Sequence, residues 1–153
     1  RLASLASLQT EIESVASFVS SVVTGASVKY EIPAKPTVDT LVVRLQTSNS
    51  ASETRTHWRN DRTYQIVTYG SDALSVIDKL DAINRRCMNK DMLIPITGSM
   101  RYIRINGFGF AAPFRTEGGL WAAIGVLETE TREARDQETY EKIMRVYARF
   151  LIS

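Results

Sequence analysis

The spacing of apolar residues switches back and forth along the chain, and this switching limits the folds that the chain can adopt. In three segments the apolar residues recur every three or four positions, which is the spacing of one helix face. Between them lie shorter runs in which apolar residues alternate with polar ones or follow one another directly, as is typical of strands. This order predicts an α+β fold, with a mixed, mostly antiparallel sheet flanked by an N-terminal, a middle and a C-terminal helix.

The first helical segment covers residues 2–23 and consists mostly of small residues between its apolar positions. Glu11 and Glu13 are the only charged residues between Leu2 and Gly25, and Gly25 predicts the end of the helix. A signal peptide is the alternative, but serine interrupts the continuous apolar stretch that such a peptide needs. The apolar stripe consists of Leu2, Leu5, Leu8, Ile12, Val15, Val19, Val22 and Val23.

Two further helices follow from the same spacing. Ser71 is predicted to cap a middle helix that runs from Asp72 to about Met88, and the last helix is predicted from near Asp136 to Ile152. Neither an internal repeat nor a domain boundary is visible, so a single domain is expected over residues 1–153. The two apolar stripes are Leu74, Ile77, Leu80, Ile83 and Cys87, and then Tyr140, Ile143, Met144, Tyr147, Phe150 and Leu151.

Strand candidates fill both intervals between the helices. In the stretch 53–69 polar and apolar residues alternate, which predicts two antiparallel strands joined near Asn60 and Asp61, with 48–52 as a turn or mobile loop before them. Residues 120–128 form the most apolar strand and are expected at the centre of the sheet. The other candidates are 28–32, 41–47, 92–96, 102–105 and 108–114.

The composition is that of a soluble globular domain. Of the 153 residues, 44% are hydrophobic and 24% are charged, and the formal net charge is +2. This near balance provides no general attraction to nucleic acid or to an anionic membrane surface. No uncharged apolar run approaches the roughly 20 residues of a membrane-spanning helix, so we expect no membrane association.

One cysteine and one histidine restrict the chemistry that the chain can perform. A single cysteine, Cys87, excludes a disulfide within the chain and suits a reducing compartment. Cys87 lies on the apolar stripe of the middle helix, where a thiol behaves as a small hydrophobic group. A small enzyme built on Cys87 and His57 is therefore a weak alternative, and we expect no catalytic residues.

Metal and cofactor sites are not expected either. The carboxylates at Glu128, Glu130, Glu133 and Asp136 lack the loop pattern of a calcium site, and Arg132 and Arg135 between them predict a solvated, self-paired segment. The Gly107/Gly109 and Gly118/Gly119 pairs lack the helix start and lysine that a phosphate-binding loop uses.

The densest basic segment covers residues 55–62 and contains Arg55, Trp58, Arg59 and Arg62. Three arginines and an aromatic residue could bind a phosphate backbone, so a nucleic-acid-binding module is one alternative. Glu53 and Asp61 reduce the positive charge, and arginine and tryptophan are also typical of protein interfaces. We predict a projecting segment that contacts a neighbouring protein.

Several segments together resemble small tail terminator proteins of long-tailed bacteriophages. They are the run Arg62-Thr-Tyr-Gln-Ile-Val-Thr-Tyr69, the middle helix with Asp72, Leu74, Leu80 and Ile83, the pairs Ile103-Arg-Ile105 and Phe108-Gly-Phe110, and the run from Trp121 to Arg132. The resemblance covers most of the chain and is one of architecture and weak sequence pattern. The long, nearly uncharged first helix and the polar segment 48–52 depart from it.

The resemblance implies a structural virion protein without an active site. Such proteins form a hexameric ring in the neck of the virion, assembled in the cytoplasm of the host bacterium. The ring caps the tail tube, ends its polymerisation and presents a surface to the head connector or a head-completion protein, and DNA passes through its lumen without sequence recognition. Another phage neck or head-completion protein is the nearest alternative.

Overall fold

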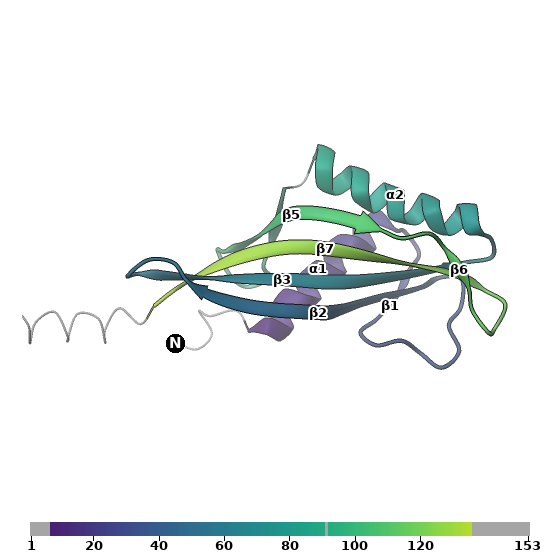
Figure 1. Cartoon of the computed structure of the whole chain (residues 1–153), viewed down its shortest axis with the longest axis horizontal. Helices are drawn as coiled ribbons and strands as arrows, with labels where there is room; N and C mark the ends of the chain where they lie inside the picture. Colours follow the sequence, from purple (N-terminus) through teal and green to yellow (C-terminus); the bar gives the residue numbers. More distant parts are fainter. Residues whose placement is uncertain (1–6, 91, 136–153) are drawn as a thin grey trace, which may run out of the picture.

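The computed structural model describes residues 7–90 and 92–135, which form one mixed sheet and two helices (Figure 1). The α+β prediction is therefore confirmed, whereas the predicted helix from Asp136 to Ile152 lies outside the described residues. In chain order the elements are α1 (Leu8–Val22), β1 (Ser27–Lys29), β2 (Thr40–Ser52), β3 (His57–Gly70), α2 (Ala73–Asn89), β4 (Leu93–Pro95), β5 (Tyr102–Phe110), β6 (Phe114–Arg115) and β7 (Trp121–Ala134).

The sheet has the strand order β1-β2-β3-β7-β5-β4, and β6 pairs with the first residues of β7. Only β1 and β2 are parallel, while every other neighbouring pair is antiparallel. β7 pairs with β3 along all 14 of its residues and with β5 on its other side. The prediction that the apolar run 120–128 forms a central strand is thus confirmed.

The connection between β2 and β3 lies at residues 53–56, so the predicted connection near Asn60 and Asp61 is wrong. Residues 48–52, predicted as a turn or loop, belong to β2 and pair with 58–62 of β3. Asn60 is fully buried and accepts a hydrogen bond from Ser50 Oγ at 2.6 Å while it donates one to Glu133 Oε2 at 2.6 Å. These polar residues make cross-strand pairs, so their turn propensity is overridden.

The start of α2 agrees with the prediction to within one residue, whereas α1 starts at Leu8 after its cap Ser7 and not at residue 2. Leu2 and Leu5 of the predicted stripe lie outside the described residues. Asp72, rather than Ser71, caps α2, because its carboxylate accepts a hydrogen bond from the Ser75 backbone N–H at 2.9 Å. The helix is also rotated relative to the predicted stripe, since Leu74 is 72% exposed. Its buried residues are Val76, Leu80, Ile83 and Cys87.

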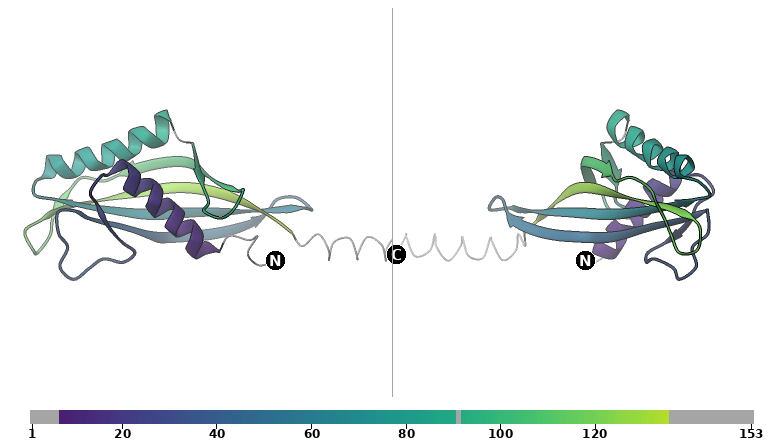
Figure 2. Two further views of the ribbon diagram at one scale, coloured as in Figure 1. Left: turned by 180° about the vertical axis from the view of Figure 1, so that it is seen from behind. Right: turned by 45° about the vertical axis from the view of Figure 1, so that its right-hand side comes forward.

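Both helices pack on the same face of the sheet (Figure 2). They cover one side of the main core, and β2, β3, β5 and β7 form its other side. The opposite face carries no described helix, and we call it the open face. The main core contains Val15 and Val19 of α1, Leu80 and Ile83 of α2, and Leu41, Val43, Tyr64, Ile66, Ile103 and Leu127 of the sheet.

Gly125 of β7 lies against side chains of α2 and β5, Leu80 and Phe108. A Cβ atom at this position would lie 2.7 Å from Phe108 Cζ and 3.2 Å from Leu80 Cδ2. Neither distance can be accommodated without displacing a buried side chain. The glycine therefore sets how closely the helix and the neighbouring strand can approach β7.

We predict that Gly125→Ala lowers the free energy of unfolding by about 1–3 kcal/mol, because the added methyl group overpacks the core. Gly109→Ala is the matched control, since a Cβ atom at that strand position has no neighbour within 4 Å. The control is expected to change stability by less than about 0.5 kcal/mol. Urea unfolding of the two variants and the wild type measures both values, and equal stabilities would contradict the packing assignment.

Candidate interaction surface

A three-stranded ribbon extends past both helices at one end of the molecule (Figure 1). We define the ribbon as residues 47–52 of β2, 57–62 of β3 and 129–134 of β7, which pair with one another in continuous register. Its side chains are almost entirely polar. The open face of the ribbon is exposed to solvent, whereas four polar side chains on its other face are buried: Asn60, Arg62, Thr129 and Thr131.

The turn at the tip of the ribbon is held by its own polar groups. Thr54 Oγ1 accepts hydrogen bonds from the backbone N–H of His57 at 2.9 Å and of Thr56 at 3.3 Å. The guanidinium of Arg135 donates to the carbonyl of Thr54 at 3.0 Å and to Ser52 Oγ at 2.5 Å. The end of β7 is thereby tied to the turn, so the tip is a defined structure.

The structure does not bring the four predicted interface residues onto one surface. Arg55 is exposed in the turn, while Trp58 and Arg62 point to the face on which the helices pack. Arg59 points to the open face, because neighbouring side chains of a strand alternate between its two sides. Arg62 is only 9% exposed and contacts α1, so its guanidinium is engaged within the chain.

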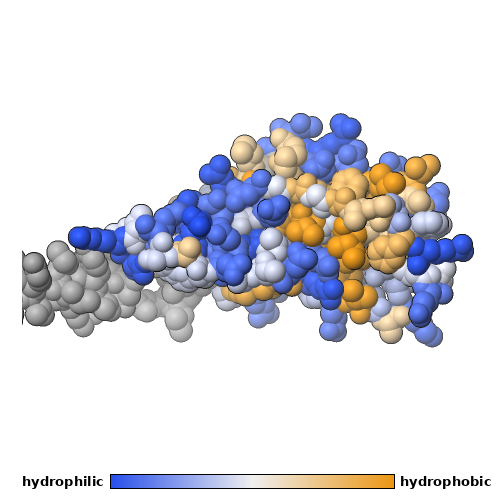
Figure 3. Space-filling view, in the orientation of Figure 1, coloured by the Kyte–Doolittle hydropathy of each residue, from blue (hydrophilic) through white to orange (hydrophobic). Residues whose placement is uncertain are grey.

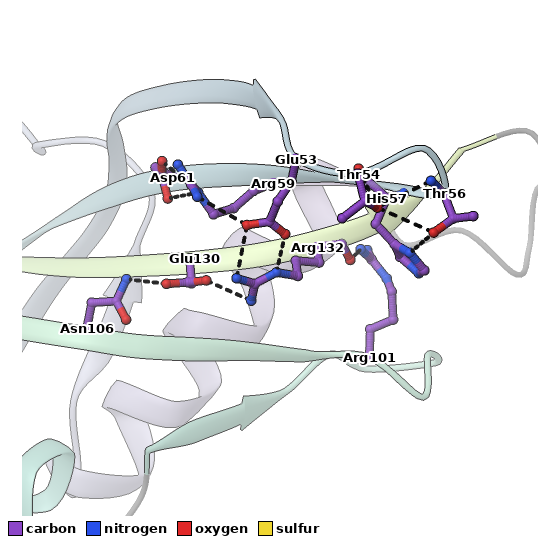
Figure 4. Close-up of polar contacts among 10 residues, drawn as sticks. All are labelled: Glu53, Thr54, Thr56, His57, Arg59, Asp61, Arg101, Asn106, Glu130 and Arg132. Atoms are coloured by element: carbon purple, nitrogen blue, oxygen red, sulfur yellow. Dashed lines mark hydrogen bonds and ion pairs between the residues drawn. The ribbon is translucent and has the colours of Figure 1, made fainter.

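Five charged residues form a connected ladder on the open face of the ribbon (Figure 4). The guanidinium of Arg132 binds Glu53 at 2.6 Å and Glu130 at 2.8 Å. Arg59 binds the same Glu53 at 3.2 Å and Asp61 at 3.1 Å. We call Glu53, Arg59, Asp61, Glu130 and Arg132 the charge ladder.

The charge ladder neutralises the positive charge that the basic segment carries in the sequence. Its two guanidinium groups face three carboxylates, so the ladder itself has a formal charge of −1. The hydrogen bond from Arg132 holds the pKa of the Glu53 carboxyl below its usual value, so Glu53 is ionised at neutral pH. The predicted self-pairing of the charged run after residue 128 is confirmed for Arg132 and Glu130, although Arg132 also reaches across to Glu53.

A buried ion pair connects α1 with the base of the ribbon. Glu11 is 1% exposed and accepts a hydrogen bond from Arg62 Nη1 at 2.5 Å. Arg101 approaches the second oxygen of Glu11 at 3.7 Å and Glu133 at 3.9 Å, which adds a second cation. Burial raises the pKa of Glu11, while the attraction to Arg62 opposes that rise.

Glu11 is not among the predicted site residues, although the sequence contains a signal for its burial. Leu8, Glu11, Val15 and Val19 are spaced by three or four residues, so Glu11 lies on the apolar stripe of the first helix. A carboxylate on such a stripe is buried and needs a cation. Its partner could not be identified, because Arg62 lies 51 residues further along the chain.

The open face is apolar at the end away from the ribbon. Val42, Val67, Tyr69 and Ala122 form a small buried cluster there, and Ile124 packs against it. In Figure 3 the hydrophobic colouring gathers over this end, and the hydrophilic colouring over the ribbon. The open face therefore has an apolar half and a charged half.

The other candidate groups, Cys87 and His57, lie on different elements, α2 and β3. Cys87 is 1% exposed, which confirms its predicted burial, while His57 is exposed at the ribbon with its ring Nδ1 2.9 Å from Thr56 Oγ1. The structure thus does not join the two as a catalytic pair. In the described ranges no group of three His, Cys, Asp or Glu side chains could hold a metal ion, and no helix there could span a membrane.

A cavity of about 430 Å³ lies beside the start of α2 and is lined in part by Thr68, Ser75 and Lys79. The ammonium of Lys79 donates to the carbonyls of Val38 at 2.7 Å and Tyr69 at 2.6 Å, and burial lowers its pKa. The lysine therefore serves to fasten the segment before β2 to α2.

No family model matches the chain, and no curated protein sequence matches it.

We predict that Arg62→Met lowers the free energy of unfolding by about 3–5 kcal/mol, because it leaves Glu11 buried without its main cation. The double variant Glu11→Leu/Arg62→Met is expected to recover most of this loss, since it removes both charges. Arg85→Ala is the control, because Arg85 forms an exposed pair with Asp81 and its removal should change stability little. Urea unfolding measures all three, and a double variant as unstable as the single one would contradict the pair as the source of stability.

Proposed function

We propose that this chain is a structural protein of a bacteriophage virion that closes the head-proximal end of the tail tube as a hexameric ring. The ring ends polymerisation of the tube and provides the surface for head joining. Its partners are further copies of itself, the tail tube protein, and the head connector or a head-completion protein. In this role the chain performs no catalysis, and DNA crosses the lumen without sequence recognition.

The observation that carries the proposal is the ribbon, which is well ordered and yet extends past the helices. A three-stranded extension with polar side chains on both faces contributes little to the hydrophobic core. It is nevertheless held by the charge ladder, by Asn60 and by Arg135. A rigid projection of this kind supports a role in contacts with neighbouring molecules, because a pre-ordered surface loses little entropy on binding.

The resemblance set out from the sequence supplies the identity of those neighbours. The segments that carry it form β3, α2, β5 and β7, which together build the centre of the fold. The proposal places the protein in the neck of the virion and its assembly in the bacterial cytoplasm. The full predicted arrangement, in which a third helix also flanks the sheet, is part of this proposal.

The structure supports two alternative functions to different extents. Another phage neck or head-completion protein would use the same ribbon and the same open face. A nucleic-acid-binding module has less support, because Arg59 and Arg62 are paired with carboxylates and only Arg55 of the three arginines lies free at the turn. Binding to DNA that weakens steeply with added salt would favour that module.

Electron microscopy of isolated tails tests the position of the protein. We expect antibody or gold label against this chain at the head-proximal end of each tail, and we expect a closed ring there in averaged images. Tails assembled without the protein should lack a defined end and vary in length. Label along the whole tail, or protein found only on DNA, would contradict the terminator function.

A double substitution tests the ribbon as a contact surface. Trp58→Ala/Arg59→Ala removes an aromatic group and a cation from its two faces, and we expect weaker assembly on tails with little change in the circular dichroism spectrum or melting of the monomer. Arg85→Ala on the exposed side of α2 is the matched control and should assemble normally. If the double variant unfolds, the ribbon belongs to the core and the contact assignment is wrong.

A further inference from the structure

The outer edge of β2 lacks a strand partner along most of its length. β1 pairs only with Thr40, Leu41 and Val42, and in the described part of the chain no strand pairs with the outer side of residues 43–52. Residues 46–50 are five consecutive exposed residues. A strand edge of this kind presents backbone N–H and C=O groups to which another strand can bind.

Features that normally block such an edge are missing here. Residues 45–52 contain no charged residue, no proline and no glycine. The register shift between Leu45 and Thr47 is the one irregularity of the β2–β3 pairing, and it leaves Thr47 to Ser52 in regular register. Ser48 and Ser50 bind Arg62 and Asn60 of the neighbouring strand, so their side chains do not cover the edge.

A second open edge lies on β5, at the other side of the sheet. β4 pairs with Tyr102, Ile103 and Arg104, and the carbonyl of Met92 accepts from the N–H of Ile105 at 2.8 Å. Beyond this point residues 106–110 have no outer strand neighbour among the described elements, and they carry no charge. Phe110 remains 38% exposed at this edge.

The directions of β2 and β5 allow β2 of one copy to pair with β5 of another copy. β2, β3, β7 and β5 are successive neighbours, each antiparallel to the next, so β2 and β5 run in opposite directions. A second copy rotated about an axis inclined to the strands brings its β5 beside β2 in nearly antiparallel orientation and displaced along the strands. β1 and β4 cover the two edges at opposite ends, so the free lengths meet when the copies are staggered along the strands.

We propose that β2 of one copy pairs with β5 of the next copy, with residues 47–52 along residues 106–110. This inference rests on the proposed ring and names the contact between its subunits. The two sides of the contact differ, so the same contact repeats from copy to copy and closes when the rotation divides a full turn. The pairing joins the sheets of neighbouring copies and covers Phe110, and no charged residue of either segment has to be desolvated.

Cysteine cross-linking tests the pairing, because Cys87 is buried and leaves engineered thiols to react. Asn49 and Ala51 point to the open face, as do Gly107 and Gly109. A Cβ atom at Gly109 meets nothing within 4 Å, and one at Gly107 meets only the Glu128 carboxylate at 3.6 Å or more. The four double variants combine Asn49→Cys or Ala51→Cys with Gly107→Cys or Gly109→Cys.

We expect at least one double variant, oxidised under assembling conditions, to form a ladder of disulfide-linked species from dimer upward on denaturing gels. Disulfides require Cα atoms within about 4.4–6.8 Å, which facing residues of paired strands satisfy. Asn49→Cys combined with Ala82→Cys on the exposed side of α2 is the matched control and should give no ladder. Abundant dimers from Asn49→Cys alone would show pairing of two β2 edges and overturn the proposal.

Electron microscopy of the same samples separates this inference from the ring. Closed rings without a cross-linked ladder would overturn the strand pairing and leave the ring in place. A ladder with open chains and no rings would retain the pairing and overturn the ring. Failure of both measurements would overturn both proposals.

Discussion

The buried pair of Glu11 and Arg62 fixes how the helices and the sheet fit together. A carboxylate that is 1% exposed can remain charged only next to a cation, so α1 can dock in one position along β3. Arg62 also marks the point on β3 where the apolar core gives way to the polar ribbon. Toward Gly70 the strand supplies Tyr64 and Ile66 to the core, and toward His57 it supplies Asn60 to a polar network. The ion pair thus separates the part that folds by burial from the part that projects.

The ribbon shows how a polar extension can be ordered without a core of its own. Cross-strand pairs replace apolar contacts, and the charge ladder links β3 and β7 to the turn through Glu53. Individually such exposed pairs contribute little, but a connected network holds several side chains in one arrangement. Pairing with carboxylates also neutralises two of the three arginines in the segment 55–62, Arg59 and Arg62. A surface that is rigid and nearly neutral is better suited to protein contacts than to a phosphate backbone.

Several elements could be predicted because their signals are local. The apolar run that became β7 identified the central strand, and the stripe of α2 identified Cys87 as buried. The turn near Asn60 was wrong because Asn60 binds partners on two other strands, Ser50 and Glu133, and Glu133 lies 73 residues away in the sequence. The pairing of Glu11 with Arg62 was missed for the same reason. Local spacing indicates which residues are buried, whereas charge pairs and strand order depend on the assembled sheet.

The position of β7 has a consequence for how the chain folds during synthesis. It is the last described strand along the chain, yet it lies between β3 and β5 and joins the two sides of the sheet. Until β7 has left the ribosome, no strand joins β5 to β3, so β2 and β3 form a hairpin whose stability depends on packing against the helices. Contacts such as Asn60 with Glu133, 73 residues apart, then form late and slow the folding reaction. The nascent chain therefore exposes the inner edges of β3 and β5 until β7 has been synthesised. During that interval it depends on chaperones or on low concentration to avoid aggregation.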